Sequence, residues 1–163
     1  MKTKIQWFLF LIIATMLPLT AYANTATIEK VLRGDRLQIK GWEVVRLSGI
    51  IAPALDEPFG EEAYQLAKQE LEGKLVRMAT YTTDNTAVGI VRDPEGLCLV
   101  QIEYGDTALS DKKAAIDFGA SLLDKGLARV DERYLPDYLQ HYREIEKTAK
   151  EKKIGIWKDL KDE

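Results

Sequence analysis

The sequence predicts an α+β domain in which a closed five-stranded β-barrel is combined with three α-helices. Short segments that alternate apolar and polar residues, separated by glycine-containing turns, dominate residues 26–102. Helical periodicity appears once between these segments and twice after them. The 163 residues, 46% hydrophobic and 30% charged, are typical of one globular domain.

The barrel begins with three expected strands. They cover residues 26–32, 36–40 and 42–50. Gly34 and Gly41 stand at the tight turns between them, where a residue without a Cβ is favoured. Because side chains alternate along a strand, Val45 and Leu47 share one face of the third strand, and Arg46 lies on the other.

A loop and a helix are expected after the third strand, at 53–60 and 61–71. The helix has apolar residues at helical spacing, Glu61 and Glu62 in its first turn, and Gly73 after its end. The next predicted elements are a strand at 74–81, a polar turn at 82–85, a short strand at 87–91, a turn at 93–96 and a strand at 97–102.

Two more helices are expected to complete the domain. After a loop at 103–112, one helix runs from 113 to 125 and is stopped by Gly126. The other starts at Pro136, a favoured first helical residue, and ends before Gly155. Its apolar stripe consists of Leu139, Tyr142, Ile145 and Ala149.

The N-terminus has the three parts of a secretory signal peptide. Lys2 and Lys4 precede an apolar run at 7–17, and small residues stand at 21 and 23. An uncleaved anchor is the alternative, but the apolar run is shorter than the about 20 residues that span a bilayer. We expect a signal peptide at 1–23 and a single domain at 24–163, exported to the periplasm or secreted, with no membrane span after cleavage.

The net charge argues against one class of binding partner, and the cysteine content excludes internal disulfide bonds. Without Lys2 and Lys4, the 23 basic residues fall to 21 against 26 acidic ones, a net charge of −5. A protein that grips a nucleic-acid backbone usually has a basic surplus, so the global balance argues against that class of partner. Cys98 is the only cysteine, which excludes an internal disulfide, and its apolar neighbours indicate a small buried side chain.

Six short sequence motifs occur in a specific order and at a specific spacing. They are VLRGDRL (31–37), VRLSGIIAP (45–53), FGEEA (59–63), DPEGLCL (93–99), LLDKGLARV (122–130) and KKIGIW (152–157). Together they resemble the staphylococcal nuclease (thermonuclease) family over nearly all of residues 25–157. The resemblance implies an OB-type five-stranded barrel with three helices and calcium-dependent phosphodiesterase chemistry.

The resemblance implies that three functional positions are retained. Asp35 matches a metal ligand of the first turn, and Arg46 matches the first catalytic arginine. Tyr134 matches an aromatic position of the substrate pocket. Arg46 is expected either to bind an anion or to be a surface arginine paired with Asp35 or a loop acid. These residues are the candidate site.

Other positions of the family pattern carry unsuitable residues. The second metal ligand falls on Ile51, the general base on Ala54 and the second catalytic arginine on Leu97. A positioned base contributes about 10²–10⁴-fold and a charge-stabilising arginine about 10³–10⁵-fold, so either loss is crippling.

The sequence around Asp35 suggests what replaces the cation. The acid that the family has two residues earlier is Arg33 here, and Arg36 follows Asp35 directly. We expect these two guanidinium groups to neutralise the Asp35 carboxylate.

Two functions follow as alternatives. The first is an exported pseudonuclease, a monomeric binding or scaffold module without a cofactor, whose partner is a protein, a glycan or an oligonucleotide. The second is an active Ca²⁺-dependent endonuclease with a rearranged site, in which Arg46 acts with Asp56 or Glu57 as the base.

Overall fold

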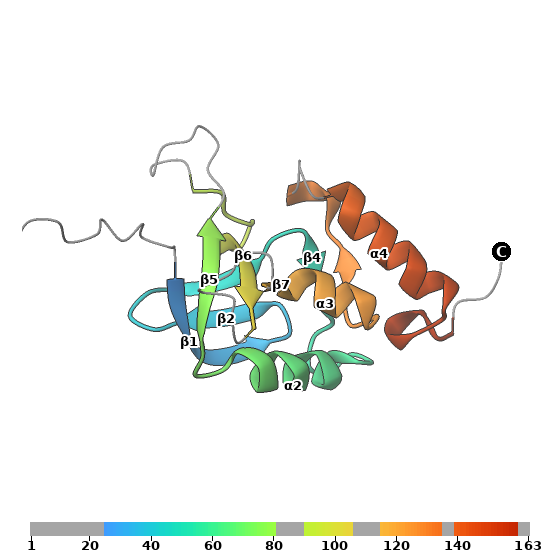
Figure 1. The fold of residues 1–163 in the computed structure, drawn as a ribbon, viewed down its shortest axis with the longest axis horizontal. Coiled ribbons are helices and arrows are strands. Elements are labelled where there is room, and N and C mark those ends of the chain that lie inside the picture. Colours follow the sequence, from blue (N-terminus) through green and yellow to red (C-terminus); the bar gives the residue numbers. More distant parts are fainter. Residues whose placement is uncertain (1–24, 81–89, 106–114, 135–138, 160–163) are drawn as a thin grey trace, which may run out of the picture.

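The computed structural model describes residues 25–80, 90–105, 115–134 and 139–159. Its fold is mixed α+β, a five-stranded β-barrel with three α-helices, which confirms the predicted class (Figure 1). The expected signal peptide, the turn at 82–85, most of the strand at 87–91 and the helix start at Pro136 lie outside the described residues.

Five strands form the barrel. They are β1 (Thr25–Arg33), β2 (Arg36–Ile39), β3 (Val44–Leu47), β5 (Leu75–Thr80) and β6 (Cys98–Tyr104). Antiparallel pairs join β3 to β2, β2 to β1, β1 to β5 and β5 to β6, and a parallel pairing of β3 with β6 closes the ring. The short β7 (Ile116–Asp117) extends the sheet beside β6.

A second, two-stranded sheet lies beside the barrel. It pairs β4 (Ile50–Ile51) with β8 (Arg129–Val130) in antiparallel fashion. The strand predicted at 42–50 is therefore wrong in extent. Gly49 has φ 72°, a left-handed conformation that turns the chain between β3 and β4.

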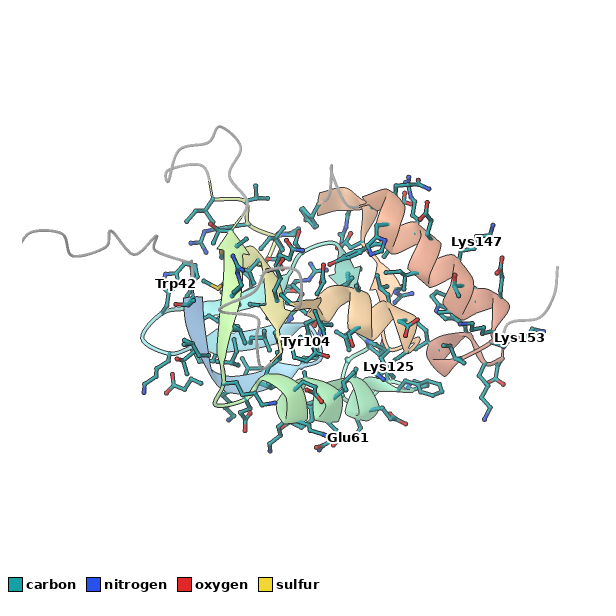
Figure 2. All side chains as sticks on the ribbon, viewed as in Figure 1. Trp42, Glu61, Tyr104, Lys125, Lys147 and Lys153 are labelled. Carbon is teal, nitrogen blue, oxygen red and sulfur yellow. The ribbon has the colours of Figure 1, made fainter. Side chains whose placement is uncertain are left out.

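Three helices pack around the sheets. They are α2 (Gly60–Leu71), α3 (Phe118–Asp124) and α4 (Leu139–Glu151), with 3₁₀ turns η3 (Glu132–Tyr134) and η4 (Gly155–Trp157). Helix α2 packs against β1, and α3 lies between β6 and α4 (Figure 1). Glu61 on α2 and Lys147 on α4 project away from the core (Figure 2).

The predicted start of the second helix is wrong. The helix begins at Phe118 rather than at 113, because Ile116 and Asp117 pair with β6 instead. The Asp117 carboxylate caps the helix by accepting a hydrogen bond from the Ala120 N–H at 3.2 Å. A pairing with a distant strand has overridden the local helical pattern.

One continuous core fills the barrel and the space under the helices. Val45 and Leu47, predicted on the same face, are both fully buried in it. Tyr104 of β6 packs edge-on against Phe118 of α3, with ring centroids 5.5 Å apart. Cys98 is fully buried as expected, and burial raises the pKa of its thiol, so it is an inert core residue. Among the described residues, no helix is both long and apolar enough to cross a bilayer.

Candidate functional site

The tight turn between β1 and β2 places Asp35 inside the protein. A Cβ on Gly34 would lie 2.8 Å from the Cβ of Ala63, so only a glycine lets this turn pack so closely against α2. The Asp35 side chain is completely buried. Its Oδ2 accepts a hydrogen bond from the Ala52 N–H at 3.2 Å, which ties the turn to the segment after β4.

Arg33 neutralises the buried Asp35 carboxylate. Its Nε donates to Oδ1 at 2.6 Å and its Nη2 donates to Oδ2 at 2.8 Å, a bidentate arrangement. The hydrogen bond to Asp35 is the main cause that raises the pKa of Arg33 above its ordinary value. The expected neutralisation of Asp35 by a neighbouring guanidinium is thus confirmed for Arg33.

The same expectation is wrong for Arg36. Its Nη1 donates to Oε2 of Glu95 at 2.8 Å, and its Nη2 donates to the other carboxylate oxygen. This pair lies at the surface, and the hydrogen bond from Arg36 lowers the pKa of Glu95. Asp35 instead receives its second guanidinium neighbour from Arg46, whose Nε lies 3.7 Å from Oδ2.

Arg46 is buried on β3, with 6% of its surface exposed. Its Nη2 donates to Oδ2 of Asp131 at 2.8 Å and to the carbonyl oxygen of Ile50 at 3.2 Å. Its Nη1 donates to Oδ2 of Asp93 at 3.4 Å. Arg46 therefore pairs with acidic residues, which was one of its two expected roles. It does so in the interior, however, and not at the surface as that expectation stated.

Asp93 shapes the turn before β6. Its Oδ1 accepts hydrogen bonds from the N–H groups of Glu95 at 2.9 Å and Leu97 at 3.0 Å. Its Oδ2 faces Arg46, and the residue is 5% exposed. At Leu97, where the family resemblance implies an arginine, the chain contributes a backbone N–H to the turn.

Asp131, directly after β8, is a site residue that the sequence analysis missed. Arg133 donates to it through Nε at 2.8 Å and Nη2 at 2.9 Å. Burial alone would raise the pKa of Asp131, but the hydrogen bonds from Arg133 and Arg46 outweigh it and lower that pKa. The one available signal was the spacing of Asp131 and Arg133, which is the spacing of Arg33 and Asp35.

These residues form one charge-balanced group, which we call the arginine–aspartate cluster. Its members are Arg33, Arg46, Arg133, Asp35, Asp93 and Asp131. Three guanidinium groups thus face three carboxylates. No group of three or more His, Cys, Asp or Glu in the described part of the chain is arranged to hold a metal ion. The donor set does not fit Ca²⁺, which takes six to eight oxygen ligands, because Ile51 has none and the oxygens of Asp35 already accept hydrogen bonds.

Asp131→Asn should lower the free energy of unfolding by about 2–3 kcal/mol at pH 7, because Arg46 and Arg133 lose a charged partner. The folded pKa of Asp131 lies below its ordinary value of about 3.9. Its contribution is therefore complete above that value and is lost as the pH falls through the folded pKa. Urea denaturation from pH 7 to pH 2 should show the two proteins converging in stability below about pH 4. A difference that stays constant over this range would contradict the prediction.

Tyr134 lies in η3, next to the cluster. The Arg133 guanidinium stacks over its ring at 5.3 Å from the centroid. Its carbonyl oxygen accepts a hydrogen bond from the Ser48 hydroxyl at 3.2 Å. The ring is half-buried, so the structure brings Tyr134 to the edge of the group that contains Arg46 and Asp35.

The two candidate replacement bases lie in the loop before α2. Oε2 of Glu57 accepts a hydrogen bond from the Ala54 N–H at 2.7 Å, so this contact closes the loop on itself. Asp56 and Glu57 are exposed. Neither forms a hydrogen bond or ion pair with Arg46 in the part of the chain that the structure describes.

Comparison with known proteins gives one family match. The sequence profile described as "Staphylococcal nuclease homologue" matches residues 44–159, well over half of the chain.

Two curated proteins are similar to the chain, both named "Probable endonuclease LCL3". The protein from Arthroderma otae (strain ATCC MYA-4605 / CBS 113480) is 26% identical over 128 residues, which cover 70% of this chain and 40% of that protein. The protein from Coccidioides posadasii (strain C735) is 28% identical over 131 residues, which cover 72% of this chain and 37% of that protein. The chain thus spans about 40% or less of the length of these relatives.

Proposed function

The chain belongs to the staphylococcal nuclease homologue family, and we propose that its domain binds a partner without hydrolysing phosphodiesters. The observation that carries the proposal is the burial of Arg46 among Asp35, Asp93 and Asp131. A guanidinium that stabilises a phosphoryl transition state must face the substrate oxygens. Here its donors face protein carboxylates and a backbone carbonyl.

The role of general base in hydrolysis also lacks a suitable residue. Ala54 offers no base, and Glu57, the nearest replacement, bonds to its own loop. General-base catalysis needs a carboxylate within hydrogen-bond reach of the attacking water. The site thus supports a pseudonuclease that needs no metal, whose partner is a protein, a glycan or an oligonucleotide bound on the barrel and its loops. We place this domain at 24–163, exported after loss of a signal peptide at 1–23.

A second candidate is favoured by the names of the similar proteins. Both are called probable endonucleases, which agrees with the enzymatic alternative rather than with a pseudonuclease. In that alternative, Arg46 would leave its carboxylates, and Asp56 or Glu57 would serve as the base in a Ca²⁺-dependent reaction. This rearrangement requires the cluster to open.

A cleavage assay separates the two functions. Purified chain, incubated with single- and double-stranded DNA and Ca²⁺, should release no more acid-soluble product than buffer does. Ca²⁺ should also leave the melting temperature unchanged, because only an ion bound to the folded state raises it. Ca²⁺-dependent cleavage that Arg46→Lys abolishes, in a variant shown to be folded, would establish the endonuclease instead.

Restoring the family residues should create activity. The required changes are Arg33→Asp, Ile51→Asp, Ala54→Glu and Leu97→Arg. Arg33 is included because it occupies both oxygens of Asp35. We expect Ca²⁺-dependent cleavage at least about 10²-fold above the same variant with glutamine at position 54, since a positioned base contributes about 10²–10⁴-fold. Equal rates for the two variants, both folded, would show that the lost residues are not what limits this scaffold.

A further inference from the structure

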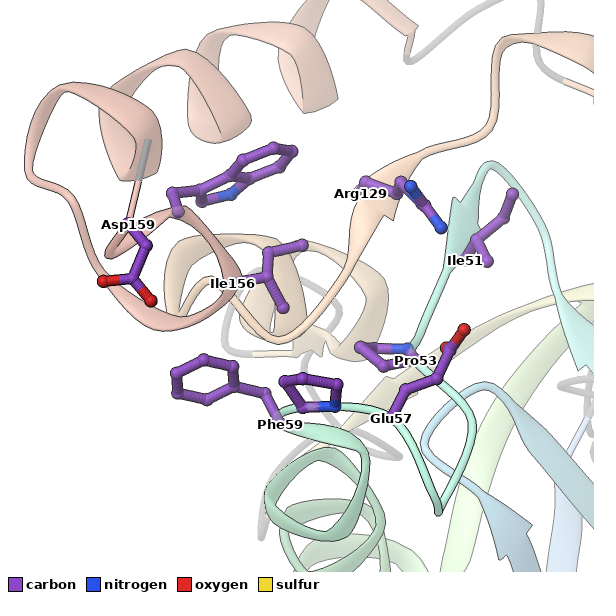
Figure 3. A pocket seen from close by; sticks show the side chains of 9 residues that line it. Ile51, Pro53, Glu57, Phe59, Arg129, Ile156 and Asp159 are labelled. Atoms are coloured by element: carbon purple, nitrogen blue, oxygen red, sulfur yellow. The ribbon is translucent and has the colours of Figure 1, made fainter. Parts of the chain in front are cut away.

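A cavity whose lining contains no member of the arginine–aspartate cluster opens between the loop before α2, β8 and η4. Its volume is about 370 Å³, within the range of small-molecule sites. The walls are mainly apolar and come from Ile51, Pro53, Phe59, Ile156 and Trp157. Figure 3 shows Phe59 and Ile156 on one side of this space and Ile51 with Arg129 on the other.

The charged groups of the cavity are of both signs. Arg129 from β8 and Glu57 from the loop extend into the space from opposite sides (Figure 3), and Asp159 lies at the end next to η4. Within the described residues, Arg129 forms no ion pair or side-chain hydrogen bond, unlike the three arginines of the cluster. The apolar cavity thus carries, near Arg129 and Glu57, one cation without an ion-pair partner among the described residues and one acid, whereas Asp159 lies at its far end (Figure 3).

The loop that forms one wall is held in a conformation that is unusual for its sequence. Phe59 has φ 65° and ψ 6°, the left-handed region that residues with a side chain rarely adopt. The next residue, Gly60, packs so tightly that a Cβ on it would lie 1.7 Å from the Ala54 carbonyl oxygen. The fold therefore fixes Phe59 at the cavity against its own backbone preference, as is often seen where a ligand binds.

We infer that this cavity binds a free α-amino acid with an aromatic or branched apolar side chain. Arg129 would receive the carboxylate, for which a guanidinium offers two parallel donors. Glu57 would attract the protonated amine, while Phe59 and Trp157 would contact the apolar side chain. A phosphate dianion is disfavoured, because two carboxylates line the same space. The inference goes beyond the proposed function, and it uses Glu57, which is one of the two candidate bases of the endonuclease alternative.

Calorimetric titration of the full chain with three probes tests the assignment. The probes are L-phenylalanine, phenethylamine, which lacks the carboxylate, and 3-phenylpropionate, which lacks the amine. Each analogue should bind at least about tenfold more weakly than L-phenylalanine, because each loses one charge-assisted contact. Equal binding of 3-phenylpropionate would overturn the role of Glu57, and absence of L-phenylalanine binding would overturn the whole proposal.

Arg129→Gln tests the site itself. Arg129 is exposed, so the variant should fold, which thermal unfolding checks. Its affinity for L-phenylalanine should fall about tenfold, while its affinity for phenethylamine should not fall, because that cation has no carboxylate for Arg129 to bind. Arg143→Gln is the matched control, because Arg143 is an exposed arginine of α4 outside the cavity lining and should leave both affinities unchanged. A loss of L-phenylalanine affinity in the control, or none in Arg129→Gln, would refute the inference.

Discussion

Replacing Arg46 with methionine should lower the free energy of unfolding by about 3–5 kcal/mol, the usual effect of removing one partner from a buried ion pair. Methionine fills much of the same volume but leaves the carboxylates of Asp35, Asp93 and Asp131 facing one another. Asp35 and Asp131 keep their other arginines, whereas Asp93 loses the only ion pair within 4 Å that it forms among the described residues. Urea denaturation at pH 7 gives the difference.

The matched control for this substitution is Arg92→Met. Arg92 also forms an arginine–carboxylate pair, with Glu43 at 2.8 Å, but both side chains are partly exposed. A surface pair contributes about 0–1 kcal/mol, so the control should stay within about 1 kcal/mol of the parent. If both variants lose the same stability, burial of the cluster has no special energetic role and the interpretation of Arg46 as an interior counter-ion fails.

Gly155→Ala should be nearly as damaging, with a loss of about 3 kcal/mol or more. An added Cβ would lie 2.0 Å from the Gly126 carbonyl oxygen, and this same oxygen accepts a hydrogen bond from the Ile156 N–H at 2.9 Å. The substitution must therefore push the tail away from the end of α3 and break that bond. Chemical denaturation measures the loss, and hydrogen exchange at Ile156 and Trp157 shows whether the tail detaches.

Gly41→Ala separates the steric clash from the backbone conformation. Gly41 and Gly155 both have positive φ, 73° and 57°, so alanine is unfavourable at each by about 1–2 kcal/mol. An added Cβ at Gly41 meets no atom within 4 Å. Gly41→Ala should therefore lose about 1–2 kcal/mol only. A Gly155→Ala variant no less stable than Gly41→Ala would mean that the tail accommodates the methyl group without cost.

Local signals were sufficient to predict several elements of the fold. Helix α2, expected at 61–71, occupies Gly60–Leu71, because acidic residues in its first turn and a glycine after its end mark both boundaries. The alternation of β3 correctly placed Val45 and Leu47 together in the core. Local signals could not predict which strands close the barrel. Closure pairs β3 with β6, about fifty residues later in the chain, and no periodicity within either strand specifies its partner.

The site was predicted less completely, for the same reason. Alternation put Arg46 opposite the core face, which suggested exposure. The structure covers that face with Asp93 and Asp131, which lie 47 and 85 residues further along the chain. The pairing of Arg33 with Asp35 was predictable because only one residue separates them. The sequence thus identified the local half of the arginine–aspartate cluster and missed the half that the fold assembles.

Because Arg33 and Asp35 form a bidentate contact, the effect of a mutation at one of these positions on stability depends on the residue at the other. A mutation that removes Arg33 leaves Asp35 buried with only the more distant Arg46, and a mutation that removes Asp35 leaves an arginine without its partner. Either single step passes through a less stable protein, because breaking one side of a buried pair is unfavourable. A change of Arg33 to an acidic residue would therefore require compensation elsewhere before it could persist, and the present charge pattern resists stepwise replacement.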